Sequence, residues 1–145
     1  MNIIEEINES WGWVGLEANE VVNDNDFGNL LIRDTEGQFW RLCPEDVYCE
    51  VVAIDDNEFD LLWHNEEFLE DWHMQNLVSQ ASEVLGKLDE GRKYHLTIPG
   101  VLGGEYGTSN ICTVPLVEQI RYSGDLGKQI RDLPDGAQIE LKVIE

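Results

Sequence analysis

The chain has 145 residues, a length that suits one domain with a single hydrophobic core, and 42% of the residues are hydrophobic. Its 30 acidic residues against nine Lys and Arg give a formal net charge of -21, which argues against binding to nucleic acid or to an anionic membrane. No apolar run approaches the ~18 residues of a membrane span. The amino terminus is acidic where a signal peptide is basic, so we expect a cytoplasmic protein.

The negative charge is concentrated in the first half of the chain. Residues 1–76 contain 20 acids and two bases, whereas residues 77–145 contain ten acids and seven bases. An acidic surface keeps a protein soluble without any partner. Its field also speeds the encounter with a basic partner. Both interpretations apply to an acidic face in the first half.

The first 26 residues predict a helix, a strand and a loop. Apolar residues recur at helical spacing over residues 3–13, and glycines end this helix. Residues 16–22 are expected as a strand or an extended link. The loop that follows, NDNDFGN, superficially resembles a calcium loop, but Phe27 stands where an oxygen ligand belongs. Calcium binding is therefore rejected.

A β-hairpin is the clearest local prediction. Strands are expected at residues 30–32 and 38–42 around a polar turn that contains Gly37. Phe39 and Trp40 point to opposite faces by strand alternation, so one joins the core and the other covers a second surface.

Helices are expected after a further strand at residues 50–54. The pattern places them at residues 57–63 and 65–85, with Gly86 as the C-cap of the second. Four acids crowd the first two turns of that second helix, where the helix dipole stabilises negative charge. An interaction face is the alternative explanation. The four acids are Glu66, Glu67, Glu70 and Asp71.

The second half predicts more strands than helices. Strands are expected at residues 93–98 and 111–114, and alternation predicts a closing strand at residues 137–144. Helical spacing over residues 116–130 is interrupted by serine and glycines, so two short helical pieces are expected there. The whole pattern predicts a single α+β domain with a mainly antiparallel or mixed sheet packed against helices.

A glycine-rich loop fills residues 98–115, with the sequence IPGVLGGEYGTSNICTVP. Glycines in such number imply positive φ or a close backbone approach. The loop either connects two buried strands or forms a binding loop. Its candidate residues are Gly103, Gly104, Glu105, Tyr106 and Asn110.

The sequence contains no recognisable catalytic or metal-binding motif. Cys43, Cys49 and Cys112 are odd in number and lie in apolar surroundings, so reduced, buried and inert thiols are expected. The histidines and cysteines lack zinc-ligand spacing, and no serine has the flanking glycines of a nucleophile elbow. We therefore expect neither an enzyme nor a protein with a cofactor or metal.

Four motifs occur in an order that resembles a known bacterial family. They are FGNLLIRDTEGQFWRLCPED at residues 27–46, EEFLEDWHM at 66–74, IPGVLGGEYGTSN at 98–110 and SGDLGKQIRDLPDG at 123–136. Together they resemble the family named for the carboxy-terminal domain of a type VI secretion DNase-immunity protein, over nearly the whole chain.

The resemblance implies an immunity protein that binds a cognate antibacterial toxin, often a nuclease, inside the producing cell. Family members often carry an additional amino-terminal module that resembles GAD domains. Residues 1–26 are interpreted either as a remnant of that module or as the first helix and strand of the domain. The family provides no catalytic residue to transfer to this chain.

A nuclease holds phosphates with Lys and Arg, so an inhibitor can occupy that basic surface with carboxylates. The alternative function is a small-ligand-binding or regulatory module, in which Glu105, Tyr106 and Asn110 line a pocket beside the glycines. The residues expected to contact the toxin are Glu66, Glu67, Glu70 and Asp71, with Asp24, Asp26 and Trp63.

Overall fold

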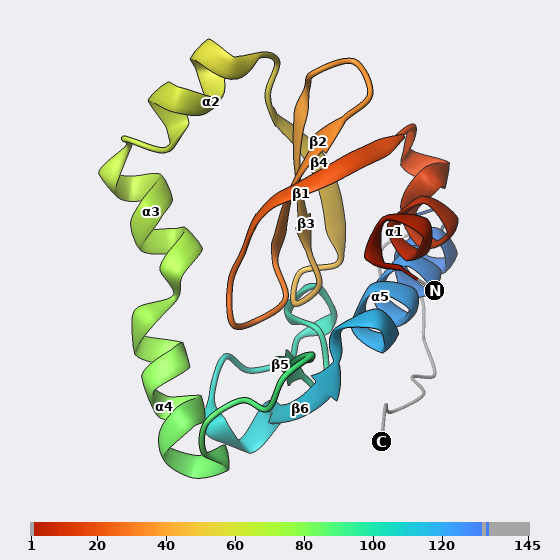
Figure 1. The fold of residues 1–145 in the computed structure, drawn as a ribbon. Coiled ribbons are helices and arrows are strands. Elements are labelled where there is room, and N and C mark those ends of the chain that lie inside the picture. The colour runs from red at the N-terminus through yellow and green to blue at the C-terminus, as the bar shows by residue number, and fades with distance from the viewer. Residues whose placement is uncertain (1, 132, 134–145) are drawn as a thin grey trace.

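A four-stranded antiparallel meander is the larger of two sheets in the computed structural model, which describes residues 2–131 and 133 (Figure 1). Strands that follow one another in the chain are neighbours in the sheet, so no connection crosses over. The strands are β1 (Ala18–Asp24), β2 (Leu30–Asp34), β3 (Phe39–Cys43) and β4 (Tyr48–Ala53).

The predicted hairpin is confirmed by β2 and β3. Gly37 has a φ of 88°, and the Asp34 carboxylate accepts a hydrogen bond from the Gln38 N–H at 2.9 Å. Phe39 and Trp40 are both buried and face opposite sides of the sheet as expected. Trp40 belongs to the larger core, whereas the Phe39 ring stacks on a helix that covers the other face.

Two helices, α1 (Ile3–Trp11) and α5 (Leu116–Ile130), pack together on the Trp40 face (Figure 1). The prediction of two short pieces for α5 is wrong, because its glycines allow close packing between helices and do not break the helix. A Cβ on Gly124 would lie 2.3 Å from the Ser10 carbonyl oxygen. The close contact between the two helices offsets the loss of stability that a glycine causes inside a helix. A one-turn 3-10 helix, η1 (Gly12–Val14), follows α1.

Three helices form a curved row on the opposite side of the molecule, along the left edge of Figure 1. They are α2 (Asp56–Leu62), α3 (Glu66–His73) and α4 (Gln75–Leu85). The single helix expected at residues 65–85 is therefore wrong. Met74 interrupts it with a left-handed φ of 47°, and Asn25 Nδ2 donates to the freed Trp72 carbonyl oxygen at 2.8 Å. A tertiary contact thus satisfies the end of α3.

A small sheet of β5 (Arg92–Leu96) and β6 (Ile111–Pro115) lies between α4 and α5 (Figure 1). The glycine-rich loop joins these strands through two 3-10 turns, η2 (Gly100–Leu102) and η3 (Thr108–Asn110). The predicted α+β class with antiparallel pairing is confirmed, although the strands form two sheets. The closing strand expected at residues 137–144 lies outside the described residues.

Candidate functional site

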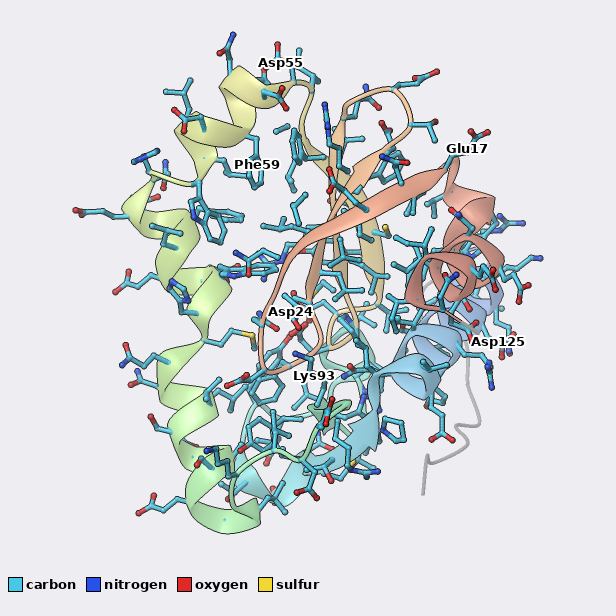
Figure 2. The ribbon with its side chains drawn as sticks, in the orientation of Figure 1. Glu17, Asp24, Asp55, Phe59, Lys93 and Asp125 are labelled. Carbon is cyan, nitrogen blue, oxygen red and sulfur yellow. The ribbon has the colours of Figure 1, made fainter. Side chains whose placement is uncertain are left out.

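The three helices of the curved row carry an exposed acidic surface. We call residues 55–86 the helical arm. No Lys or Arg occurs between Arg41 and Lys87, so the arm has no Lys or Arg of its own to offset its carboxylates. Figure 2 shows Asp55 at the start of the arm and Phe59 turned toward the sheet. The exposed acids of the arm are Asp55, Asp56, Glu58, Asp60, Glu66, Glu67, Glu70, Asp71 and Glu83.

A ladder of aromatic rings attaches the arm to the sheet. Phe59 lies between Phe39 of β3, at 4.2 Å, and Trp63, at 6.0 Å between ring centroids. Phe68 and the fully buried Trp72 stack at 6.2 Å and continue the ladder. Trp63 contacts both of them, so its half-buried ring is part of the packing as well as a candidate interface residue.

Arg41 of β3 holds α3 against the sheet. Its guanidinium lies over the rings of Phe68 and Trp72, and its Nη1 donates to Asp71 Oδ2 at 2.7 Å. Burial acts to lower the pKa of Arg41, but the hydrogen bond to Asp71 and nearby charges hold this pKa above its ordinary value. Asp71 was expected at a toxin interface; the structure shows that it also neutralises a buried cation.

The shortness of α3 changes the electrostatic argument for its acids. Glu66 and Glu67 lie in the first turn, where the dipole favours them as predicted. Glu70 and Asp71 lie in the last turn, because the helix ends at His73, and the dipole there disfavours negative charge. The dipole explanation is therefore wrong for these two. Arg41 compensates Asp71, whereas within the described part of the chain the Glu70 carboxylate has no hydrogen-bond or ion-pair partner.

A groove of about 370 Å³ opens beside Glu70, where α3, α4 and the glycine-rich loop meet. Its position brings together acids and a loop tyrosine that are distant in the sequence. Both sets were expected to be functional, but the sequence offered no reason to join them. The lining residues are Glu70, Asp71, Met74, Gln75, Asn76, Leu77, Gln80 and Tyr106.

Internal hydrogen bonds fix the glycine-rich loop. The buried Asn110 side chain accepts from the Ile98 N–H at 2.9 Å and donates to the Ile98 and Glu105 carbonyl oxygens. A Cβ on Gly104 would lie 1.8 Å from the Ile98 oxygen, so only glycine fits there. Gly103 has a φ of 90°. These contacts support the packing interpretation and leave Asn110 no free polar group for a ligand.

The loop is docked on the turn between β3 and β4. The Gly100 N–H donates to the Glu45 carbonyl oxygen at 2.6 Å, and the Tyr106 hydroxyl donates to Asp46 Oδ1. Burial and this hydrogen bond raise the pKa of Tyr106. Tyr106 is nevertheless 46% exposed as a residue.

Beneath the docked loop lies a buried polar network that sequence analysis missed. Asn29 Nδ2 donates to both Glu45 carboxylate oxygens at 2.6 and 2.9 Å, and Cys43 donates to the same group at 2.8 Å. Arg41 Nε donates to Asn29 Oδ1 at 3.0 Å. Burial raises the pKa of Glu45 despite these donors. The sequence signal for this network is the occurrence of polar residues within otherwise apolar strand motifs.

Residues 56–127 match the model of the family described as T6SS immunity protein Tdi1, C-terminal. This stretch is similar to the type VI secretion immunity family. A search among curated proteins finds no match for the chain.

The immunity-family match confirms the resemblance inferred from the motifs, but over a shorter range than expected. It covers the helical arm from Asp56, the small sheet, the glycine-rich loop and α5 as far as Gly127. The motif at residues 27–46 lies outside it, although Arg41 and Glu45 hold the matched part in place.

Two further acids expected at the toxin interface lie in the loop after β1. Asp24 forms an ion pair of 2.7 Å with Lys93, and the two side chains face one another in Figure 2. Asp26 is exposed. Asn25, between them, is bonded to the end of α3, so this loop adjoins the arm.

Three free cysteines are present, and burial raises the pKa of Cys43 and that of Cys49, the latter to about 12. Such thiols are poor nucleophiles. Cys112 is only partly buried, contrary to expectation. Among the described residues, no three His, Cys, Asp or Glu side chains are grouped so that they could hold a metal ion. None of the helices in this part of the chain has the length and apolar character of a membrane span.

Proposed function

We propose that the protein is a non-enzymatic immunity protein that binds a cognate type VI effector in the cytoplasm of the producing cell and blocks it. The observation that supports this most is the family match over residues 56–127, which includes the whole of α2, α3 and α4. The effector we propose is a nuclease, because a nuclease presents Lys and Arg to phosphates and the helical arm carries exposed carboxylates and no Lys or Arg.

The contact face we propose is the outer surface of the arm. Glu66, Glu67 and Glu70 are exposed, and none of them is needed by the aromatic ladder beneath. Asp71 belongs to the contact face as well as pairing with Arg41. Three further residues extend this face, namely Asp24, Asp26 and Trp63. Exposed charges of this kind mainly accelerate association, whereas buried anchors determine dissociation.

The test is retention of an effector by the tagged protein in its native bacterium. The expected result is one basic effector domain, retained at low salt and released progressively as salt is raised, whose toxicity the protein suppresses on co-expression. Retention of no effector under either condition would refute the immunity function.

A charge-reversed variant locates the face. Glu67→Lys with Glu70→Lys should lower the association rate constant for the recovered effector by ~10-fold or more at low salt. The control, Glu36→Lys with Glu90→Lys, changes the net charge equally at exposed acids outside the arm. Equal effects of the two variants would move the interface elsewhere and leave the immunity function intact.

The alternative, a small-ligand module at the glycine-rich loop, has less support. Asn110 is occupied within the loop, and Glu105 Oε2 accepts from Ser109 at 3.4 Å. An effector interface should bury ~800 Å² on each side, far more than a ligand pocket. The size of the recovered partner distinguishes the two functions.

A further inference from the structure

The groove between α3, α4 and the glycine-rich loop combines three kinds of surface. Glu70 and Asp71 provide carboxylates, Met74 and Leu77 provide half-buried apolar side chains, and Tyr106 provides an exposed aromatic ring. A Lys or Arg side chain has the matching composition, because a cation caps an apolar stem that packs on hydrophobic surface. A cation is also attracted to an aromatic face.

The electrostatics of α3 single out Glu70 within this groove. Its charge lies in the last helical turn, where the dipole disfavours it, and in the described part of the chain no cation pairs with it. Within α3 itself, folding therefore gives no reason for this carboxylate, although the first turn of α4, which also lines the groove, favours negative charge nearby. A cation supplied from outside would be attracted by the Glu70 carboxylate.

The groove is also held in its shape before any partner arrives. Tyr106 is bonded to Asp46, and its loop is fixed through Asn110. Met74 is held by Asn25, whose Nδ2 lies 3.7 Å from the Met74 sulfur. A preformed groove binds with a smaller loss of conformational entropy.

We propose that this groove receives one Lys or Arg side chain of the effector. The cation lies at the Glu70 carboxylate and against the Tyr106 ring, and its methylene stem lies against Met74 and Leu77. This assignment rests on the proposed immunity function and adds to it the specific contact that anchors the arm.

A probe that needs no effector tests the groove by itself. The full chain is titrated with N-acetyl-arginine amide and followed by NMR at the Met74 methyl and the Tyr106 ring. The neutral isostere, N-acetyl-citrulline amide, is the control ligand. The arginine probe should shift both resonances saturably, and the citrulline probe should not.

Matched variants separate the groove from the general acidic field. Glu70→Gln and Glu67→Gln remove the same charge from the same helix, but only Glu70 lines the groove. Glu70→Gln should raise the Kd for the arginine probe by ~3- to 5-fold, as expected for one exposed ion pair, and Glu67→Gln by less than ~1.5-fold. Tyr106→Phe keeps the ring but removes the hydroxyl bonded to Asp46, so it should raise the Kd less than Tyr106→Leu, which should raise it by ~3-fold.

Equal losses in Glu70→Gln and Glu67→Gln, or shifts spread evenly over the arm, would overturn the assignment. Failure of the groove differs visibly from failure of the immunity function. If the protein retains an effector but its groove does not bind the arginine probe, only the proposal for the groove is refuted. If the groove binds the arginine probe but the protein retains no effector, the immunity function is refuted.

Discussion

The α1–α5 pair and the helical arm differ in how a carboxylate is accommodated. In the α1–α5 pair, the buried Glu6 carboxylate accepts from Arg121 at 2.6 Å and from Ser10 at 2.7 Å, so a charge taken into the protein has been paired. In the helical arm, Glu70 is exposed at the unfavourable end of its helix and has no ion-pair partner among the described residues. The pair uses its buried charge in folding, whereas the arm exposes a carboxylate that no described side chain neutralises.

The two parts also differ in how they are attached. The α1–α5 pair packs backbone against backbone, since Gly124 lies against the Ser10 carbonyl group. The arm touches the sheet through side chains, from Phe39 to Trp72 and through Arg41. An element attached through side chains can open locally while the rest stays folded. The comparison therefore predicts separate responses to substitution.

The largest expected effect is on the attachment of the arm. Trp72→Ala should lower the free energy of unfolding by about 3–5 kcal/mol, because it empties a fully buried site in the aromatic ladder. Hydrogen exchange should show lost protection in α3 and α4 with α1 and α5 still protected. Trp72→Phe retains a ring and should lose much less. Uniform loss of protection over both parts would contradict the comparison.

The next effect concerns the helix pair. Gly124→Ala should lower the free energy of unfolding by about 3 kcal/mol, although alanine favours helices, because its Cβ would lie 2.3 Å from a backbone oxygen. Urea unfolding measures this change. Lys128→Ala, an exposed site on the same helix, should stay within about 0.5 kcal/mol of the parent. A stabilised Gly124→Ala protein would show that the helices can separate at little cost.

The free energy of unfolding is expected to depend on pH through His95 of β5. Burial lowers the pKa of His95 from 6.5 to about 4, so this side chain stays neutral in the folded state while the unfolded state takes up a proton. Stability should therefore fall as pH falls from about 6.5 toward 4, by about 2 kcal/mol between pH 7 and pH 5. Urea unfolding at both pH values should show a smaller difference in His95→Gln. An unchanged difference would assign the acid sensitivity to other groups.

The smallest expected effect is on stability, when the charge of Glu67 or of Glu70 is removed at opposite ends of α3. Glu70→Gln should raise the free energy of unfolding by about 0.3–1 kcal/mol, and Glu67→Gln should lower it by a similar amount, because they lie at opposite ends of the α3 dipole. Thermal unfolding at low salt provides the measurement. A shift of the same sign in both variants would mean that overall charge repulsion outweighs the dipole.

Local patterns in the sequence determined much of this structure. The hairpin around Gly37, the helix-capping Gly86 and the strands on each side of the glycine-rich loop were predictable, because turn chemistry and strand alternation act between near neighbours. The acidic character of residues 55–86 was likewise visible without a structure.

Tertiary structure alone decided where the helices break. Gly124 was expected to interrupt α5, but contact with α1 makes glycine the residue that fits. Met74 was expected within a helix, but Asn25 binds the carbonyl group exposed by the break. Such outcomes depend on partners distant in the sequence, which periodicity cannot detect.

The candidate site follows the same division. The sequence determined that Glu70 is acidic and that Tyr106 lies in a glycine-rich loop. Only the fold decided that Glu70 lies at the end of α3, where the dipole opposes its charge, and that Tyr106 lies beside it. The physical reason is that charge and propensity belong to single residues and short segments, whereas the field and neighbours of a residue come from elements that pack together from distant parts of the chain.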